Sequence, residues 1–140
     1  AEHFAEALLS ANEGRESFKT EAKHNRDLLI SLLVPSLKDI FVQEGRTQAP
    51  HILNLALPGR DTDYLVALLD EAGFALSTRS ACETDSEEGS RAVFALTGDQ
   101  EKARSTIRIS WGPSIRTRDL IRFAKAFTKA VVFIDSNRVR

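Results

Sequence analysis

The segment Ser105-Thr-Ile-Arg-Ile-Ser-Trp111 alternates between polar and apolar residues over its whole length. A period of two places successive side chains on opposite faces of a β-strand. The two isoleucines and the tryptophan therefore share one face, and the polar residues share the other, with Arg108 at its centre. The chain must contain a sheet with one apolar face, and other elements have to cover that face.

Helical periodicity lies on both sides of this strand. Apolar residues recur at steps of three and four from Phe4 to about Leu33, which predicts a long amphipathic helix that ends before Pro35. We expect this helix to pack on the sheet along only part of its length. Thr117 can cap a last helix. The apolar face of that helix is formed by Leu120, Phe123, Ala124, Phe127 and Val131.

The sequence predicts two further strands between these helices. Gln43–Pro50 is typical of a polar loop, and the short apolar run 51–57 that follows it lies between two prolines, which favours a strand. Phe74–Thr78 predicts another strand, which leads directly into the segment that holds the cysteine.

Two shorter helices complete the order of elements. Asp61 or Thr62 can cap a helix that ends near Gly73, and Ser86 can begin a short helix that stops at Gly98. The resulting order favours an α+β fold: a small sandwich of a mainly antiparallel sheet with helices on one face, preceded by the long N-terminal helix.

Composition limits the class of protein. The chain has 140 residues and 42% hydrophobic content, which fits one domain. Its 19 basic and 20 acidic residues are balanced, which argues against binding to nucleic acid or to a membrane surface. No run is long enough to span a bilayer, and the N-terminus does not resemble a signal peptide. A single cysteine allows no internal disulfide, so we expect a cytoplasmic protein.

That cysteine, Cys82, lies in an unusual sequence context. A free cysteine is ordinarily a buried, hydrophobic residue, but the stretch Ser77–Ser86 surrounds Cys82 with hydroxyls and charges. A polar loop supplies the access that a reactive thiol needs. An incidental surface thiol is the competing interpretation.

Arg108 is the second candidate, because hydroxyl residues flank its guanidinium on the polar face of the strand. Such a group can bind a carboxylate through two hydrogen bonds. The alternative is an ordinary surface ion pair. The three histidines show no metal-ligand spacing, and whether His51 could act as a base for Cys82 is left open by the sequence.

Three motifs together resemble a known family: Pro50-His-Ile-Leu-Asn54, Ser80-Ala-Cys82 and Ser105-Thr-Ile-Arg-Ile-Ser-Trp-Gly112. They are similar to the C-terminal part of the cysteine desulfurases, which are pyridoxal-phosphate enzymes of the class V aminotransferase group. The likeness runs in the same order along nearly the whole chain. Its most specific parts are the Ser-Ala-Cys motif and the Arg-containing strand, with 108 − 82 = 26 positions between the two residues.

The resemblance implies a role for each candidate residue. Cys82 would attack the sulfur of L-cysteine and carry it as a persulfide, which leaves L-alanine, and Arg108 would bind the α-carboxylate of the substrate. The family's Schiff-base lysine lies in a Ser-X-His-Lys motif that this chain lacks. No cofactor-binding residue is therefore expected here, and no metal site.

The same resemblance implies that residues 1–140 are a single C-terminal domain of a larger enzyme, inactive without its pyridoxal phosphate domain. Expected partners are that large domain, a sulfur-acceptor protein and a second copy in a homodimer, with a role in iron–sulfur cluster assembly in the cytoplasm. Two alternatives stay open: a stand-alone sulfur-relay or interaction module of the same fold, and a domain of another class V relative such as a selenocysteine lyase.

Overall fold

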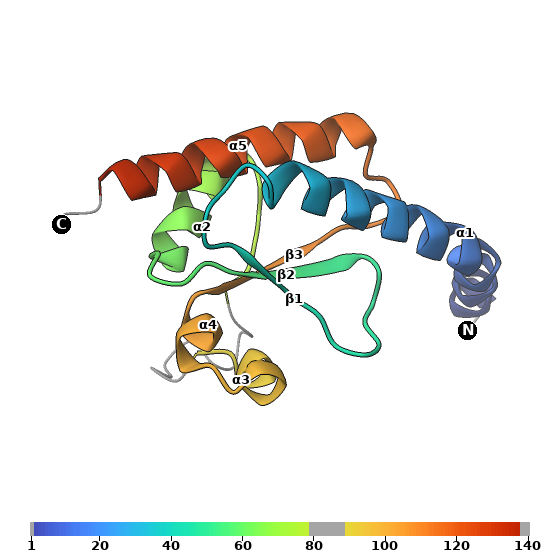
Figure 1. The fold of residues 1–140 in the computed structure, drawn as a ribbon. Coiled ribbons are helices and arrows are strands. Elements are labelled where there is room, and N and C mark those ends of the chain that lie inside the picture. The colour runs from blue at the N-terminus through green and yellow to red at the C-terminus, as the bar shows by residue number, and fades with distance from the viewer. Residues whose placement is uncertain (1, 79–88, 138–140) are drawn as a thin grey trace.

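The computed structural model describes residues 2–78 and 89–137, which form helices around a small antiparallel sheet (Figure 1). The sheet order is β1-β2-β3, and both pairs of neighbouring strands are antiparallel. In chain order the elements are α1 (Glu2–Leu33), β1 (Phe41–Gln43), β2 (Ile52–Ala56), α2 (Thr62–Glu71), α3 (Arg91–Thr97), α4 (Gln100–Arg104), β3 (Thr106–Ser110) and α5 (Thr117–Ser136).

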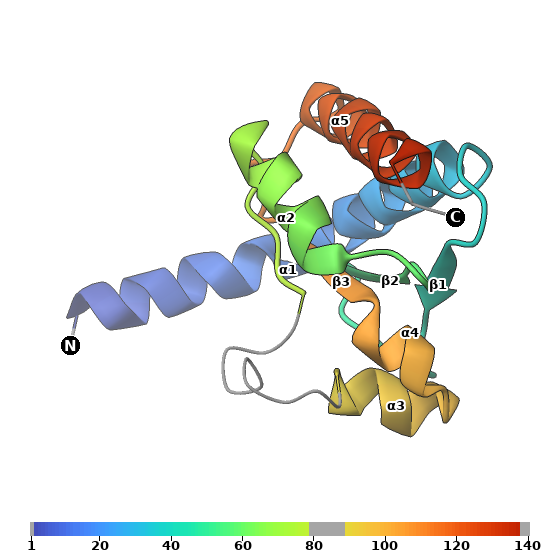
Figure 2. The ribbon, with the colours of Figure 1, turned by 90° about the vertical axis from the view of Figure 1, so that its left-hand side faces the viewer.

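The expected α+β fold with a long first helix and an antiparallel sheet is confirmed, but helices lie on both faces of the sheet and not on one. The helices α1, α2 and α5 cover one face of the sheet, and the two short helices α3 and α4 lie on its other side (Figures 1 and 2). The alternation in β3 has the predicted consequence, because Ile107, Ile109 and Trp111 are buried in the core while Arg108 and Ser110 are exposed. Each fully buried aliphatic or aromatic side chain of this kind stabilises the fold by roughly 1.5–3 kcal/mol.

Helix α1 is divided into two halves by its burial. The second half contributes Ala22, Leu29 and Leu33 to the interior and lies beside α5. The first half extends away from the sheet (Figure 2), with Phe4 75% and Leu8 61% exposed. The expectation that only part of this helix would pack on the domain is therefore confirmed.

Capping residues set most of the helix boundaries. Asp61 caps α2 by accepting a 2.9 Å hydrogen bond from the Tyr64 N–H, and Gly98 ends α3 in the left-handed conformation, both as predicted. The cap of α3 is Ser90, so the described helix begins later than Ser86, which lies outside the described residues. Thr117 was wrongly predicted as the cap of α5, since Arg116 occupies that position.

The segment Phe74–Thr78 is not the regular strand that its composition predicts. The Phe74 N–H still donates to the carbonyl of Leu69 at the end of α2, at 2.8 Å. Only Ser77 reaches the sheet, where it forms an isolated antiparallel bridge with Arg108. The segment therefore pairs with β3 through the backbone of one residue, and it does not form a continuous strand beside β3.

A buried arginine joins three distant parts of the chain. Arg60, 7% exposed, holds both carboxylate oxygens of Asp135 at 2.8 Å through Nε and an Nη. It also donates to the carbonyls of Asp39 at 3.0 Å and Lys38 at 2.9 Å. These bonds link the turn after α1, the turn before α2 and the end of α5. A planar guanidinium can make all four bonds at once, which an ammonium group cannot.

Gly89 allows a close backbone contact next to α4. Its φ is +76°, and a Cβ atom built on it would lie 2.5 Å from the carbonyl oxygen of Ala103. The next residue, Ser90, donates its N–H to that same oxygen at 2.8 Å. Glycine is therefore required at this position by both conformation and space.

The Arg60 contacts predict a large effect of substitution. Arg60→Ala should lower the free energy of unfolding by about 3 kcal/mol, since it removes the four hydrogen bonds that Arg60 donates to Asp135 and to two carbonyls. Arg118→Ala is the control. Arg118 is exposed and its Nε lies 3.9 Å from Asp119 Oδ1, and an exposed ion pair of this kind contributes less than about 1 kcal/mol to the free energy of unfolding. Urea titration followed by the fluorescence of Trp111 measures both. Equal losses would contradict the structural role of Arg60.

Gly89 and Gly98 form a matched pair for a second prediction. Both have positive φ, but nothing lies within 4 Å of a Cβ on Gly98. Gly98→Ala should cost only the left-handed conformation, about 1–2 kcal/mol, whereas Gly89→Ala should cost roughly 1–3 kcal/mol more through its backbone clash. Urea unfolding of the two variants checks the difference, and a Gly89→Ala variant as stable as Gly98→Ala would refute the clash.

Candidate functional site

Four polar residues lie in register across the sheet and form what we call the polar row: Gln43, Asn54, Arg108 and Ser77. Gln43 of β1 pairs with Asn54 of β2, Asn54 pairs with Arg108 of β3, and Arg108 pairs with Ser77. Directly opposed residues in antiparallel strands place their side chains on the same face, with Cβ atoms about 5 Å apart. The row therefore brings together residues from four separate segments.

The polar row lies on the sheet face opposite the large helices. Its burial changes along its length, from the buried Gln43 through the half-buried Asn54 to the exposed Arg108. On the same face, Phe41 of β1 lies under Lys102 of α4, with the ammonium 5.0 Å from the ring centroid. The face is thus covered toward β1 and open at Arg108.

Arg108, predicted from the sequence, is held firmly by its backbone. Its N–H donates to the Ser77 carbonyl at 2.7 Å, and its carbonyl accepts from the Ser77 N–H at 3.4 Å. On its other side it is paired with β2. Within residues 2–78 and 89–137, its guanidinium has no hydrogen bond or ion pair. A fixed, exposed cation of this kind can bind a carboxylate through two hydrogen bonds.

Asn54 belongs to the same site but was not singled out from the sequence. Its Oδ1 accepts a hydrogen bond from the hydroxyl of Thr106, a residue that is only 2% exposed. Thr106 Oγ1 also lies 3.2 Å from the Leu55 carbonyl. The available signal was a single amide in the apolar run 51–57, because a polar residue inside such a run has to find a polar neighbour.

Cys82 lies outside the described residues, but the chain on both sides of it is well anchored. Ser77 is bonded to Arg108, and Ser90 is bonded to Ala103, three residues before β3 begins. Ser77 and Cys82 are separated by 82 − 77 = 5 positions. Five residues of extended chain span at most about 18 Å. Covalent geometry therefore limits how far the thiol can lie from the backbone of Arg108.

His51, the possible base for Cys82, lies at the end of β2 nearest α1. Its ring packs against Phe18 of α1, with centroids 5.4 Å apart. Its carbonyl accepts from the Trp111 N–H at 3.2 Å, three residues beyond Arg108. Its pairing with Cys82 stays a prediction.

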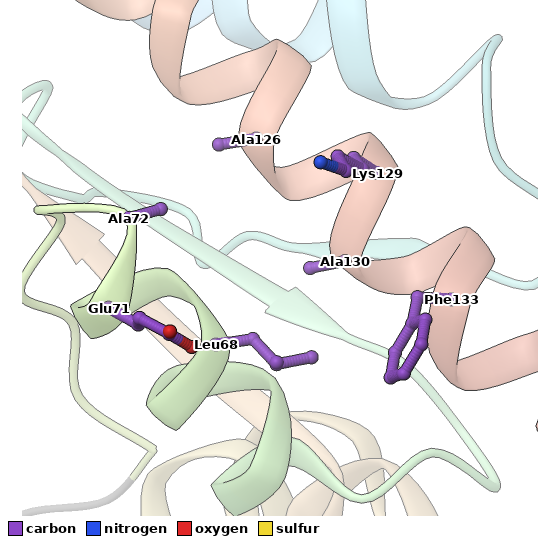
Figure 3. A pocket seen from close by; sticks show the side chains of 7 residues that line it. All are labelled: Leu68, Glu71, Ala72, Ala126, Lys129, Ala130 and Phe133. Atoms are coloured by element: carbon purple, nitrogen blue, oxygen red, sulfur yellow. The ribbon is translucent and has the colours of Figure 1, made fainter.

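A groove between α2 and α5 lies on the helical side of the domain (Figure 3). Its volume of about 480 Å³ is in the range of ligand pockets. Of its lining residues only Glu71 and Lys129 carry polar side chains, one from each helix. The groove is therefore largely apolar and separate from the polar row.

The described residues contain neither a metal site nor a membrane span. No three histidine, cysteine or acidic side chains among them are grouped as a metal site would require. No helix in these ranges has both the length and the apolar composition needed to cross a bilayer.

Comparison with curated proteins gives relatives of one kind, although no family model matches the chain. A protein of Bacillus subtilis (strain 168) that carries the name cysteine desulfurase IscS 1 is 42% identical over 64 residues, or 45% of this chain and 17% of its own length. The cysteine desulfurase of Klebsiella pneumoniae is 30% identical over 96 residues, which are 68% of this chain and 24% of that protein. The chain thus spans less than a third of the length of these relatives.

Solved structures agree with this relation at the level of fold. A NifS-like protein superposes with a TM-score of 0.76 at 22% identity, over 92% of this chain and 32% of its own. A NifS-like protein from Rickettsia africae gives 0.69 at 17% identity, over 86% and 31%. In sequence the chain is thus similar to part of the cysteine desulfurases, and in fold it is similar to part of the NifS-like proteins.

Proposed function

We propose that this chain supplies two working groups to a cysteine desulfurase: the thiol of Cys82, which takes the sulfur, and the guanidinium of Arg108, which binds the α-carboxylate of L-cysteine. The observation that carries the proposal is the pair of backbone hydrogen bonds between Ser77 and Arg108. They attach the segment that leads to Cys82 directly to the carboxylate-binding arginine. The names of the curated relatives support the same activity.

The proposed reaction is a sulfur transfer. The Cys82 thiolate attacks Sγ of the substrate, an S–S bond forms, and the substrate Cβ–Sγ bond breaks. The electron pair of the broken bond goes to the carbon skeleton, which takes up a proton and leaves as L-alanine. Arg108 keeps the substrate in one orientation by its two-point contact, so that Sγ is presented to the thiol.

The lysines of this chain lie away from the polar row. All six lysines lie on α1, α4 and α5 or in the turn after α1. Lys102 of α4 lies over the Phe41 ring and 3.4 Å from Asp99. No lysine of the described ranges lies on the polar row to hold an aldehyde cofactor there. The cofactor therefore belongs, in this proposal, to the remainder of the enzyme, together with its lysine.

The proposal extends to the partners of the complete enzyme. Sulfur would pass from Cys82 to an acceptor protein, which the polar sequence around the cysteine favours because it gives access to the thiol. We propose a homodimer that works in the cytoplasm and serves iron–sulfur cluster assembly. Residues 1–140 would be its C-terminal domain.

Replacement of Cys82 tests the sulfur-accepting role. In the complete enzyme, Cys82→Ala should abolish persulfide formation, because no other cysteine is present in this domain to take the sulfur. Incubation with ³⁵S-labelled L-cysteine followed by mass spectrometry of the alkylated peptide 77–91 measures it. Cys82→Ser serves as the matched variant without a thiol. Undiminished labelled persulfide in either variant would remove Cys82 from the mechanism.

Replacement of Arg108 tests the carboxylate contact. Loss of a charge-assisted pair costs about 1.5–3 kcal/mol, so Arg108→Ala should raise KM for L-cysteine roughly 10- to 100-fold and lower kcat less. Arg104→Ala removes the same charge from an exposed position on α4 and should leave KM unchanged. Steady-state alanine release gives both constants. An unaltered KM in Arg108→Ala would exclude the contact.

A further inference from the structure

Asn54 is the immediate cross-strand neighbour of Arg108 in the polar row. Both side chains lie on the same face, and the strand pairing keeps their Cβ atoms within about 5.5 Å. An amide and a guanidinium at this distance can act on one ligand group together. What the amide presents to that ligand depends on which of its two ends is already occupied.

Thr106 occupies the oxygen end of the Asn54 amide. Its hydroxyl, which also lies 3.2 Å from the Leu55 carbonyl, donates to Asn54 Oδ1, and Thr106 itself is only 2% exposed. The Nδ2 group of Asn54 has no partner within residues 2–78 and 89–137. Asn54 therefore presents two N–H donors on the face that carries the guanidinium of Arg108.

The two ends of the row are already bonded. Gln43 Nε2 donates to the Phe41 carbonyl at 3.3 Å, and Ser77 is engaged by Arg108 through its backbone. Within the described part of the chain, the centre of the row thus offers donors, on Asn54 and Arg108. Two adjacent donors with no acceptor between them match an oxyanion, and the planar carboxylate can accept from both.

We propose that Asn54 is a second carboxylate-binding residue, and that Thr106 positions it by fixing its amide. As a contact to the substrate of a desulfurase, this role rests on the proposed function. The carboxylate would accept two hydrogen bonds from the guanidinium of Arg108 and one from Asn54 Nδ2. Asn54 thereby adds a third point of contact, which reinforces the orientation that the two bonds from Arg108 give to the carboxylate.

The test is an NMR titration of the ¹⁵N-labelled chain with sodium acetate and with L-alanine. The side-chain amide of Asn54 and the Nε–H of Arg108 should shift together, with one apparent Kd. Acetamide, which has the same shape as acetate without the charge, should leave the NMR signals of both groups unshifted. The amides of Asn12, on the projecting half of α1, and Asn137, which donates to the Phe133 carbonyl at 2.8 Å, are internal controls.

Variants separate contact from positioning. Asn54→Ala should weaken acetate binding about tenfold, the loss expected for one hydrogen bond to a charged group. Asn54→Asp keeps the acceptor for Thr106 but replaces the donors by a negative charge, and should abolish binding. Thr106→Val should weaken binding severalfold, and Thr106→Ser should restore it. Dispersed ¹⁵N spectra verify that each variant is folded.

Two results would overturn the proposal. In the first, acetate shifts the NMR signal of the Arg108 Nε–H but not that of the Asn54 side-chain amide. This would follow if the amide turned its oxygen toward the guanidinium. In the second, the Asn54→Asp variant binds acetate as well as the unmodified chain does. The titration uses this chain alone with simple carboxylates. Its result therefore tests the Asn54 contact independently of whether the complete enzyme releases sulfur from cysteine.

Discussion

The register between β2 and β3 is the constraint on which the rest of the structure depends. It places Leu53 opposite Ile109 and Leu55 opposite Ile107 on the core face, and Asn54 opposite Arg108 on the other face. A shift of one residue would turn every side chain of β3 to the opposite face. It would expose two buried isoleucines and bury an unpaired guanidinium, which is a severe free-energy penalty. The same forces that build the core therefore aim Arg108 outward.

Strong periodic patterns made much of the fold predictable. The alternation around Arg108, the apolar stripe of the last helix and the caps at Asp61 and Gly98 each follow from local chemistry, and the structure contains all of them. The three residues of β1 and the five of α4 are too short to show a period. Their formation depends on contacts with distant parts of the chain, as does the reduction of Phe74–Thr78 to one bridge.

The candidate site was only partly visible in the sequence, for a related reason. Cys82 and Arg108 stand out by residue type and by their motifs, so the amino-acid sequence alone identifies them as candidates. Asn54 also lies in one of the motifs, but the motif indicates no role for it, because its importance comes from the residues opposite it on β3 and from the hydroxyl of Thr106. Strand register sets such neighbours, and no local pattern records it.

The long first helix gives the domain two parts of unequal stability. At 1.5 Å per residue, the 32 residues of α1 follow about 48 Å of helix, of which the second half is fixed by buried residues and by its place beside α5. The first half is exposed, so it is held mainly by its own backbone hydrogen bonds. It can therefore fray while Arg108 and the strands around it stay in place.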